Sequence, residues 1–121
     1  MTDDPVSEIA RATAARLAPE FGQNVETKVE AALYARDSSR GPEQFDPVSV
    51  GILIVAIVTL AWTVYSDHRK KAPNASAAAV EGTLRNEIRR EIEVTPDSIR
   101  ITEVVVQEIM DRHPPADGLT R

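Results

Sequence analysis

The sequence contains no cysteine, which excludes disulfide bonds, thiolate nucleophiles and cysteine-ligated metal sites. Aromatic residues make up only 4% of its 121 residues, so the chain has few large side chains with which to build a dense globular core. It has no basic excess either: 14 basic residues stand against 19 acidic ones, and the net charge of −5 argues against a nucleic-acid partner. A chain of this length forms one small domain or a few helical segments.

Residues that carry catalytic chemistry are also scarce. The two histidines, His68 and His113, are too few for a zinc site or a hydrolytic triad, and no glycine-rich phosphate loop occurs. The carboxylates Glu87, Glu91 and Glu93 are typical of the solvated face of a helix. We therefore expect no enzyme, no metal site and no cofactor.

One apolar run dominates the middle of the chain, between Asp46 and Asp67. Residues 48–65 are apolar apart from one serine and two threonines, and none of them is charged. Eighteen helical residues extend about 27 Å, close to the thickness of the hydrocarbon core of a bilayer. The alternative is a buried central helix of a soluble protein, which the flanks would have to cover on every face. Because the flanks carry only narrow apolar stripes, we predict that residues 48–65 form a transmembrane helix.

Five residues towards the C-terminal end of this run are predicted to lie at the membrane interface: Trp62, Tyr65, Arg69, Lys70 and Lys71. Aromatic rings favour the headgroup layer, and an excess of basic residues on this side predicts a cytoplasmic C-terminus. The opening residues MTDD lack the basic region of a cleaved signal peptide, so we expect an uncleaved anchor in the cell membrane. Frequent alanine and arginine suggest a bacterial protein.

The flanks are predicted to form short amphipathic helices joined by linkers. Apolar residues recur every fourth position in residues 6–18, a helix that Pro19 should end, and again from residue 21 or 24 to residue 36. The predicted segments are a helical N-terminal tail (1–36), a linker (37–47), the transmembrane helix (48–65), a basic juxtamembrane linker (66–75), a helical hairpin-like segment (76–112) and a flexible tail (113–121). The predicted fold class is mainly α, with a single-pass transmembrane helix flanked by short amphipathic helices.

The hairpin-like segment carries the clearest amphipathic stripe of the chain. Its four members are Val80, Leu84, Ile88 and Ile92. Thr95 and Pro96 then provide the N-terminal signals of a second helix. The β-branched residues between 99 and 109 are also compatible with a lone strand, which would have to pair with another molecule. We favour the helix, because the chain offers no second strand-like run.

Three classes of function fit a short single-pass chain of this kind. The first is an anchor, accessory subunit or adaptor that docks a partner through the stripe Val80, Leu84, Ile88 and Ile92, because so short a hairpin is too small to stand alone. Its partners would be membrane lipid and either another protein or a second copy of the chain. The second class is a small pore-former or toxin, and the third is a membrane signalling component. No charged pore-lining face exists in the run, and KAPNAS interrupts any heptad register, so we predict the first class.

Overall fold

The computed structural model describes residues 5–22, 24–37, 50–72 and 74–113, and their regular structure is entirely α-helical. The helices are α1 (Pro5–Phe21), α2 (Asn24–Asp37), α3 (Val50–Lys71), α4 (Ala77–Glu91) and α5 (Pro96–Arg112). The mainly α fold class is thus confirmed, and the region proposed as a possible strand lies inside α5. Most of the predicted linker 37–47 and tail 113–121 falls outside the described residues, as does the start of the predicted transmembrane segment.

Two helix boundaries differ from the sequence prediction. Helix α1 does not end at Pro19 but continues to Phe21, because a proline in the last turn removes only one helical hydrogen bond and Phe21 packs against the core. Helix α3 continues to Lys71, through much of the segment expected to be a linker. The Lys71 ammonium lies 3.2 Å from the Asp67 carboxylate one turn earlier, and basic residues at this end suit the helix dipole.

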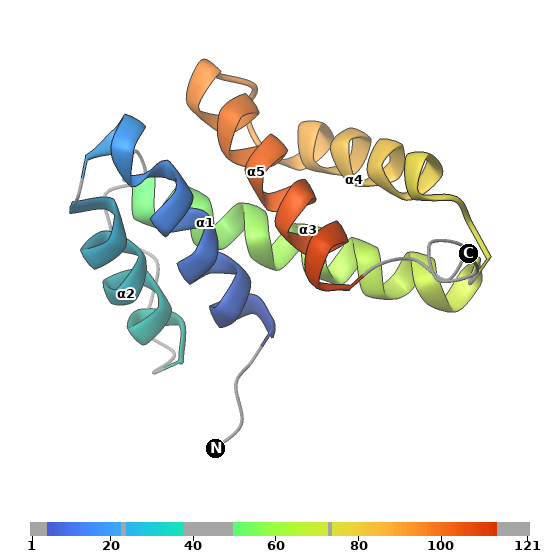
Figure 1. The fold of residues 1–121 in the computed structure, drawn as a ribbon, viewed down its shortest axis with the longest axis horizontal. Coiled ribbons are helices and arrows are strands. Elements are labelled where there is room, and N and C mark those ends of the chain that lie inside the picture. The colour runs from blue at the N-terminus through green and yellow to red at the C-terminus, as the bar shows by residue number, and fades with distance from the viewer. Residues whose placement is uncertain (1–4, 23, 38–49, 73, 114–121) are drawn as a thin grey trace.

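Helix α3 forms the axis of the fold, and the other four helices lie against it (Figure 1). The hairpin of α1 and α2 lies near the N-terminal end of α3, and α4 runs back along its C-terminal part. Helix α5 crosses α3 and contacts both α4 and α1. The N-terminal and C-terminal flanks of α3 therefore meet each other on its surface. We call the four helices α1, α2, α4 and α5 the sheath.

Local sequence signals set the helix ends within each flank. Gly22, between α1 and α2, has φ of 99°, a left-handed conformation that side chains disfavour. The Ser76 hydroxyl accepts a hydrogen bond from the backbone N–H of Ala79 at 3.1 Å and caps α4. Thr95 and Ser98 form a reciprocal capping box at the start of α5, with distances of 3.0 and 2.8 Å. The turn that reverses the chain between α4 and α5 is thus fixed by a capping box, in which Thr95 is expected from the sequence and Ser98 is not.

The core forms where the apolar stripes of the sheath meet one side of α3. The buried residues of α3 are Gly51, Ile54, Val55, Ile57, Val58, Ala61 and Tyr65. The sheath contributes fully or nearly fully buried aliphatic side chains from every helix, among them Leu17, Val29, Leu33, Leu84, Ile101 and Ile109. The spacing of four seen in the sequence therefore marks the faces that cover α3.

We expect two glycine substitutions to have opposite effects on stability. A Cβ atom at Gly51 would lie 2.5 Å from the backbone carbonyl carbon of Lys28, so Gly51→Ala must push α2 away from α3. We expect a loss of about 1–3 kcal/mol in the free energy of unfolding. A Cβ atom at Gly82 in α4 would meet no other atom within 4 Å, so Gly82→Ala should gain about 1 kcal/mol through helix propensity. Urea unfolding followed by circular dichroism measures both, and equal effects would contradict the close packing of α2 on α3.

Candidate membrane-spanning helix and its helical sheath

Helix α3 is the one described helix long and apolar enough to cross a membrane. Its 22 residues would extend about 33 Å, slightly more than the hydrocarbon core of a bilayer. Central helices of soluble proteins pass the same test of length and composition, and 39% of the most apolar window of α3 is buried inside the fold. The helix is therefore a candidate span that the chain itself partly covers.

The two sides of α3 differ in chemistry. Its uncovered side exposes Ala56, Thr59, Thr63 and Asp67, with Leu60 half-buried among them. The Thr59 hydroxyl donates to the carbonyl of Val55 at 2.8 Å, and the Thr63 hydroxyl donates to the carbonyl of Thr59 at 2.9 Å. Both threonines thus satisfy their hydroxyl groups within the helix, which suits them to water and to lipid alike. The spacing of these threonines is evident from the sequence, but the side of α3 that the sheath leaves open is not.

The aromatic residues expected at a membrane interface pack inside this fold. Tyr65 is fully buried, and its hydroxyl donates a hydrogen bond to the backbone carbonyl of His113 at the end of α5. The half-buried Trp62 ring lies 5.6 Å from the Tyr65 ring and 4.8 Å from the His113 ring, measured between centroids. These contacts tie α3 to the C-terminal end of α5. In this conformation Trp62 and Tyr65 hold the sheath on α3.

The three basic residues expected at the interface do reach the surface. Arg69, Lys70 and Lys71 are exposed in the last turn of α3, where the side chain of Arg69 lies 5.6 Å from the centre of the Tyr65 ring. His68, next to them, is half-buried, and no described residue forms a hydrogen bond with its buried Nδ1 atom. This end of α3 is therefore available to anionic groups without any rearrangement.

The stripe expected to dock a partner lies in the core instead. Val80, Leu84 and Ile88 are 2%, 0% and 2% exposed, and Ile92 is half-buried. Helix α4 places them against α3 and α5. The expectation that the chain cannot cover this stripe is wrong in this conformation, because α3 supplies an apolar surface for it. A second protein could use the stripe only after α4 leaves α3.

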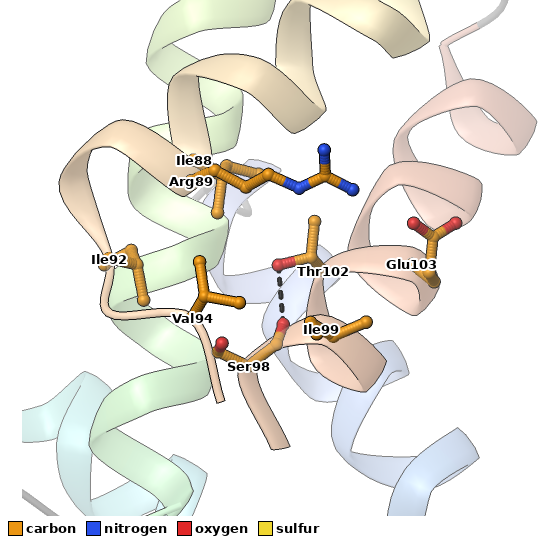
Figure 2. A pocket seen from close by; sticks show the side chains of 8 residues that line it. All are labelled: Ile88, Arg89, Ile92, Val94, Ser98, Ile99, Thr102 and Glu103. Atoms are coloured by element: carbon orange, nitrogen blue, oxygen red, sulfur yellow. Dashed lines mark hydrogen bonds between the residues drawn. The ribbon is translucent and has the colours of Figure 1, made fainter. Parts of the chain in front are cut away.

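The turn between α4 and α5 contains a small hollow (Figure 2). Its lining combines side chains from both helices and from the turn between them: Ile88, Arg89, Ile92, Val94, Ser98, Ile99, Thr102 and Glu103. Its enclosed volume is about 10 Å³, enough for about one water molecule and too little for an organic ligand. Inside it the Thr102 hydroxyl donates to the carbonyl of Ser98 at 2.6 Å. The hollow is a packing feature of the turn and offers no binding site.

Ion pairs join α1 to α5 along an antiparallel contact that we call the α1–α5 ladder. Its members are Glu8, Arg16 and Glu20 of α1 and Arg100, Glu108 and Arg112 of α5. Arg16 lies 2.9 Å from Glu108, Arg100 lies 2.5 Å from Glu20, and Arg112 lies 4.0 Å from Glu8. Arg112 also binds Glu108 at 3.0 Å. The partners in α1 and α5 are 80 or more positions apart, so no sequence spacing could have revealed the ladder.

The ladder determines what α3 can do in this conformation. Helix α1 precedes α3 and α5 follows it, so a single crossing by α3 would place the two helices on opposite sides of a membrane. The hydrocarbon core would then separate them by about 30 Å. The contact between α1 and α5 and a membrane-crossing α3 are therefore mutually exclusive.

Arginine partners shift the titration of two sheath carboxyls. The hydrogen bonds from Arg100 hold the pKa of Glu20 below its ordinary value of 4.5, and those from Arg85 lower the pKa of Glu103 in the same way. Arg85 and Glu103 join α4 to α5 at 2.8 Å. A carboxyl whose pKa is lower in the folded state stabilises the fold above pH 4.5, and this stabilisation is lost as the pH falls through the lowered pKa. The ion pairs that join the sheath helices thus weaken in acid.

Substituting the buried stripe should unfold the sheath rather than affect only partner capture. The double change Leu84→Asp and Ile88→Asp places two carboxylates in the core, and we expect the free energy of unfolding to fall by more than about 3 kcal/mol. The matched control is Ala78→Asp with Asn86→Asp, at exposed positions of α4, which should change it by less than about 1 kcal/mol. Similar unfolding curves for both variants would show that α4 does not cover α3.

Comparison with known proteins assigns the sequence to no family. The sequence matches no protein-family model, no curated protein and no solved structure. Among the described residues, no group of three or more histidines and carboxylates is placed to hold a metal ion. What distinguishes the chain is physical: a helix of membrane-spanning length and apolarity is partly covered by a sheath of helices that carry many charges.

Proposed function

We propose that this protein is a non-enzymatic membrane anchor that carries its membrane-spanning helix in a sheathed form and inserts it when the sheath opens. One observation supports this proposal above all others. Helix α3 has the length and apolarity of a span, yet the helices before and after it contact each other through the α1–α5 ladder. If α3 crosses a bilayer, the chain must adopt two conformations, one with α1 and α5 in contact and one with α3 across the bilayer.

The uncovered side of α3 lowers the free-energy cost of exchanging one conformation for the other. Ala56, Thr59 and Thr63 already face solvent, and Ile52 and Leu60 are only half-buried beside them. A bilayer would bury this side as well as the side that the sheath covers. The amphipathic sheath helices could then lie at the membrane surface with their apolar faces towards lipid. Insertion would thus replace the partial cover that the sheath gives α3 by the complete cover of the bilayer.

The inserted form would have the orientation that the basic residues predict. Arg69, Lys70 and Lys71 are exposed at one end of α3, and they would hold that end on the cytoplasmic side. They could contact anionic headgroups while the sheath is still closed. The membrane lipid would thus be the first partner of the protein.

Opening would also give the protein its adaptor role. Once α4 leaves α3, Val80, Leu84 and Ile88 lose the apolar surface that buries them. A second protein, or a second copy of the chain, could then cover this stripe. Partner docking would in this way depend on membrane insertion, because the same side chains serve both contacts.

A cross-link between α1 and α5 tests the proposal. The chain has no cysteine, so Glu20→Cys with Arg100→Cys introduces one reactive pair at a site where the native side chains form an ion pair at 2.5 Å. A short bis-maleimide should join the two helices in water. The cross-linked protein should fail to enter phospholipid vesicles, because its two flanks can no longer lie on opposite sides, whereas the unlinked variant should resist carbonate extraction.

The matched control links α1 to α2, which both precede α3. Arg11→Cys with Glu30→Cys replaces the exposed ion pair at 2.6 Å between these helices. This cross-link leaves the N-terminal and C-terminal flanks free to separate, so insertion should proceed. Equal insertion of both cross-linked proteins, or no insertion of the unlinked protein, would contradict the proposed function.

A further inference from the structure

The α1–α5 ladder contains a nearly buried carboxylate with two cationic partners. Glu108 is 8% exposed, and its two oxygens accept hydrogen bonds from Arg16 of α1 at 2.9 Å and from Arg112 of its own helix at 3.0 Å. Gln107 also accepts a hydrogen bond from Arg16 at 3.4 Å. One carboxylate thus connects both sides of the contact. Its negative charge offsets the electrostatic repulsion between the two neighbouring guanidinium groups.

Protonation of the carboxylates would change the electrostatic interaction across this contact from attraction to repulsion. Arginine keeps its charge at every accessible pH, whereas a protonated carboxyl no longer attracts it. In acid the ladder would therefore hold the positive charges of Arg16, Arg100 and Arg112 without their negative partners. Two of these, Arg16 and Arg112, share Glu108 and would repel each other across the contact. Because the hydrogen bonds from Arg100 lower the pKa of Glu20, this carboxyl is half-protonated only below pH 4.5.

Other charged groups on the neighbouring helices pair elsewhere. Arg11 of α1 binds Glu30 of α2, and Glu103 of α5 binds Arg85 of α4, which also lies 3.6 Å from Glu81. Near the C-terminal end of α5, the His113 ring lies 4.8 Å from the Trp62 ring of α3, measured between centroids. Among the described residues, no carboxylate of α2, α3 or α4 forms an ion pair with Arg16, Arg100 or Arg112.

Chain connectivity makes the contact between α1 and α5 the first to open. A short turn joins α1 to α2, and another joins α4 to α5, so these hairpins stay together even when an ion pair is lost. Helices α1 and α5 are separated by the whole of α2, α3 and α4. The entropic cost of closing a chain loop grows slowly with its length, so the contact between α1 and α5 closes at a somewhat higher entropic cost than either hairpin.

We infer that the α1–α5 ladder is a latch that opens in acid and so exposes α3 to a membrane. The inference rests on the proposed function and adds its trigger. At neutral pH the negative charges of the ladder carboxylates pair with its arginines, and the sheath is closed. Acid removes those charges, separates α1 from α5 and leaves the two hairpins intact.

Distance measurements on the full chain test the latch. Nitroxide labels on Ala15→Cys and Gln107→Cys, at exposed positions of α1 and α5, report the contact by pulsed electron resonance. Labels on Arg90→Cys and Asp97→Cys, on either side of the turn between α4 and α5, serve as the control. From neutral pH to below pH 4.5, the first distance should lengthen and the second should stay constant. An unchanged first distance would overturn the inference, as would lengthening of both distances together.

Charge variants separate the latch from general acid unfolding. Glu20→Gln with Glu108→Gln should raise the open population at neutral pH about tenfold, as expected when several ion pairs are lost. The exchanged pair Glu20→Arg with Arg100→Glu should close the contact again relative to Glu20→Gln alone. If the contact between α1 and α5 stayed closed at neutral pH in the variant Glu20→Gln with Glu108→Gln, the latch would be overturned.

Vesicles of phosphatidylcholine with phosphatidylglycerol distinguish failure of the latch from failure of the proposed function. Opening in acid without carbonate-resistant insertion would support the latch and refute the anchor. Insertion at neutral pH that acid and the Gln variant leave unchanged would support the anchor and overturn the latch. Insertion that increases with both changes would support both.

Discussion

The contact between α1 and α5 is the constraint on which the rest of the structure depends. Among the described helices, every other extensive contact joins helices that a membrane would leave on one side, or joins a flank to α3 itself. The ion pairs of α1 with α5, such as Arg16 with Glu108, instead connect a helix before α3 to a helix after it. A bilayer cannot be crossed by α3 while these pairs exist. In the proposed function, the ladder would have to open before the helical bundle could become a single-pass protein.

Helix α3 has an apolar composition that is compatible with lipid and a buried side that packs closely against the rest of the fold. Its sequence lacks charge over the length of a bilayer, which lipid requires. Its buried side interlocks with four helices, to the point that Gly51 leaves no room for a Cβ beside the backbone of Lys28. Tyr65 illustrates the overlap, since a tyrosine suited to the headgroup layer here donates its hydroxyl hydrogen to the carbonyl of His113.

Local features of the fold could be predicted from the sequence, and long-range ones could not. Thr95 and Pro96 mark the start of α5 in the sequence, because capping acts within a few residues. The stripe around Leu84 identifies a buried face, but the pattern does not say whether lipid, another chain or α3 covers it. The ladder lay wholly beyond prediction, because charged residues such as Glu20 and Arg100 look like ordinary surface groups until the fold brings them together.

The most direct test of this account is the distance between α1 and α5 in one protein under two conditions. Fluorophores attached to the two helices, one on each, would report it by energy transfer in single molecules, first in buffer and then in lipid nanodiscs. The account predicts a short distance in buffer and one of at least about 30 Å in the bilayer, the thickness of its hydrocarbon core. The same short distance in both would show that α3 remains in its sheath, and would contradict the proposal that it crosses the membrane.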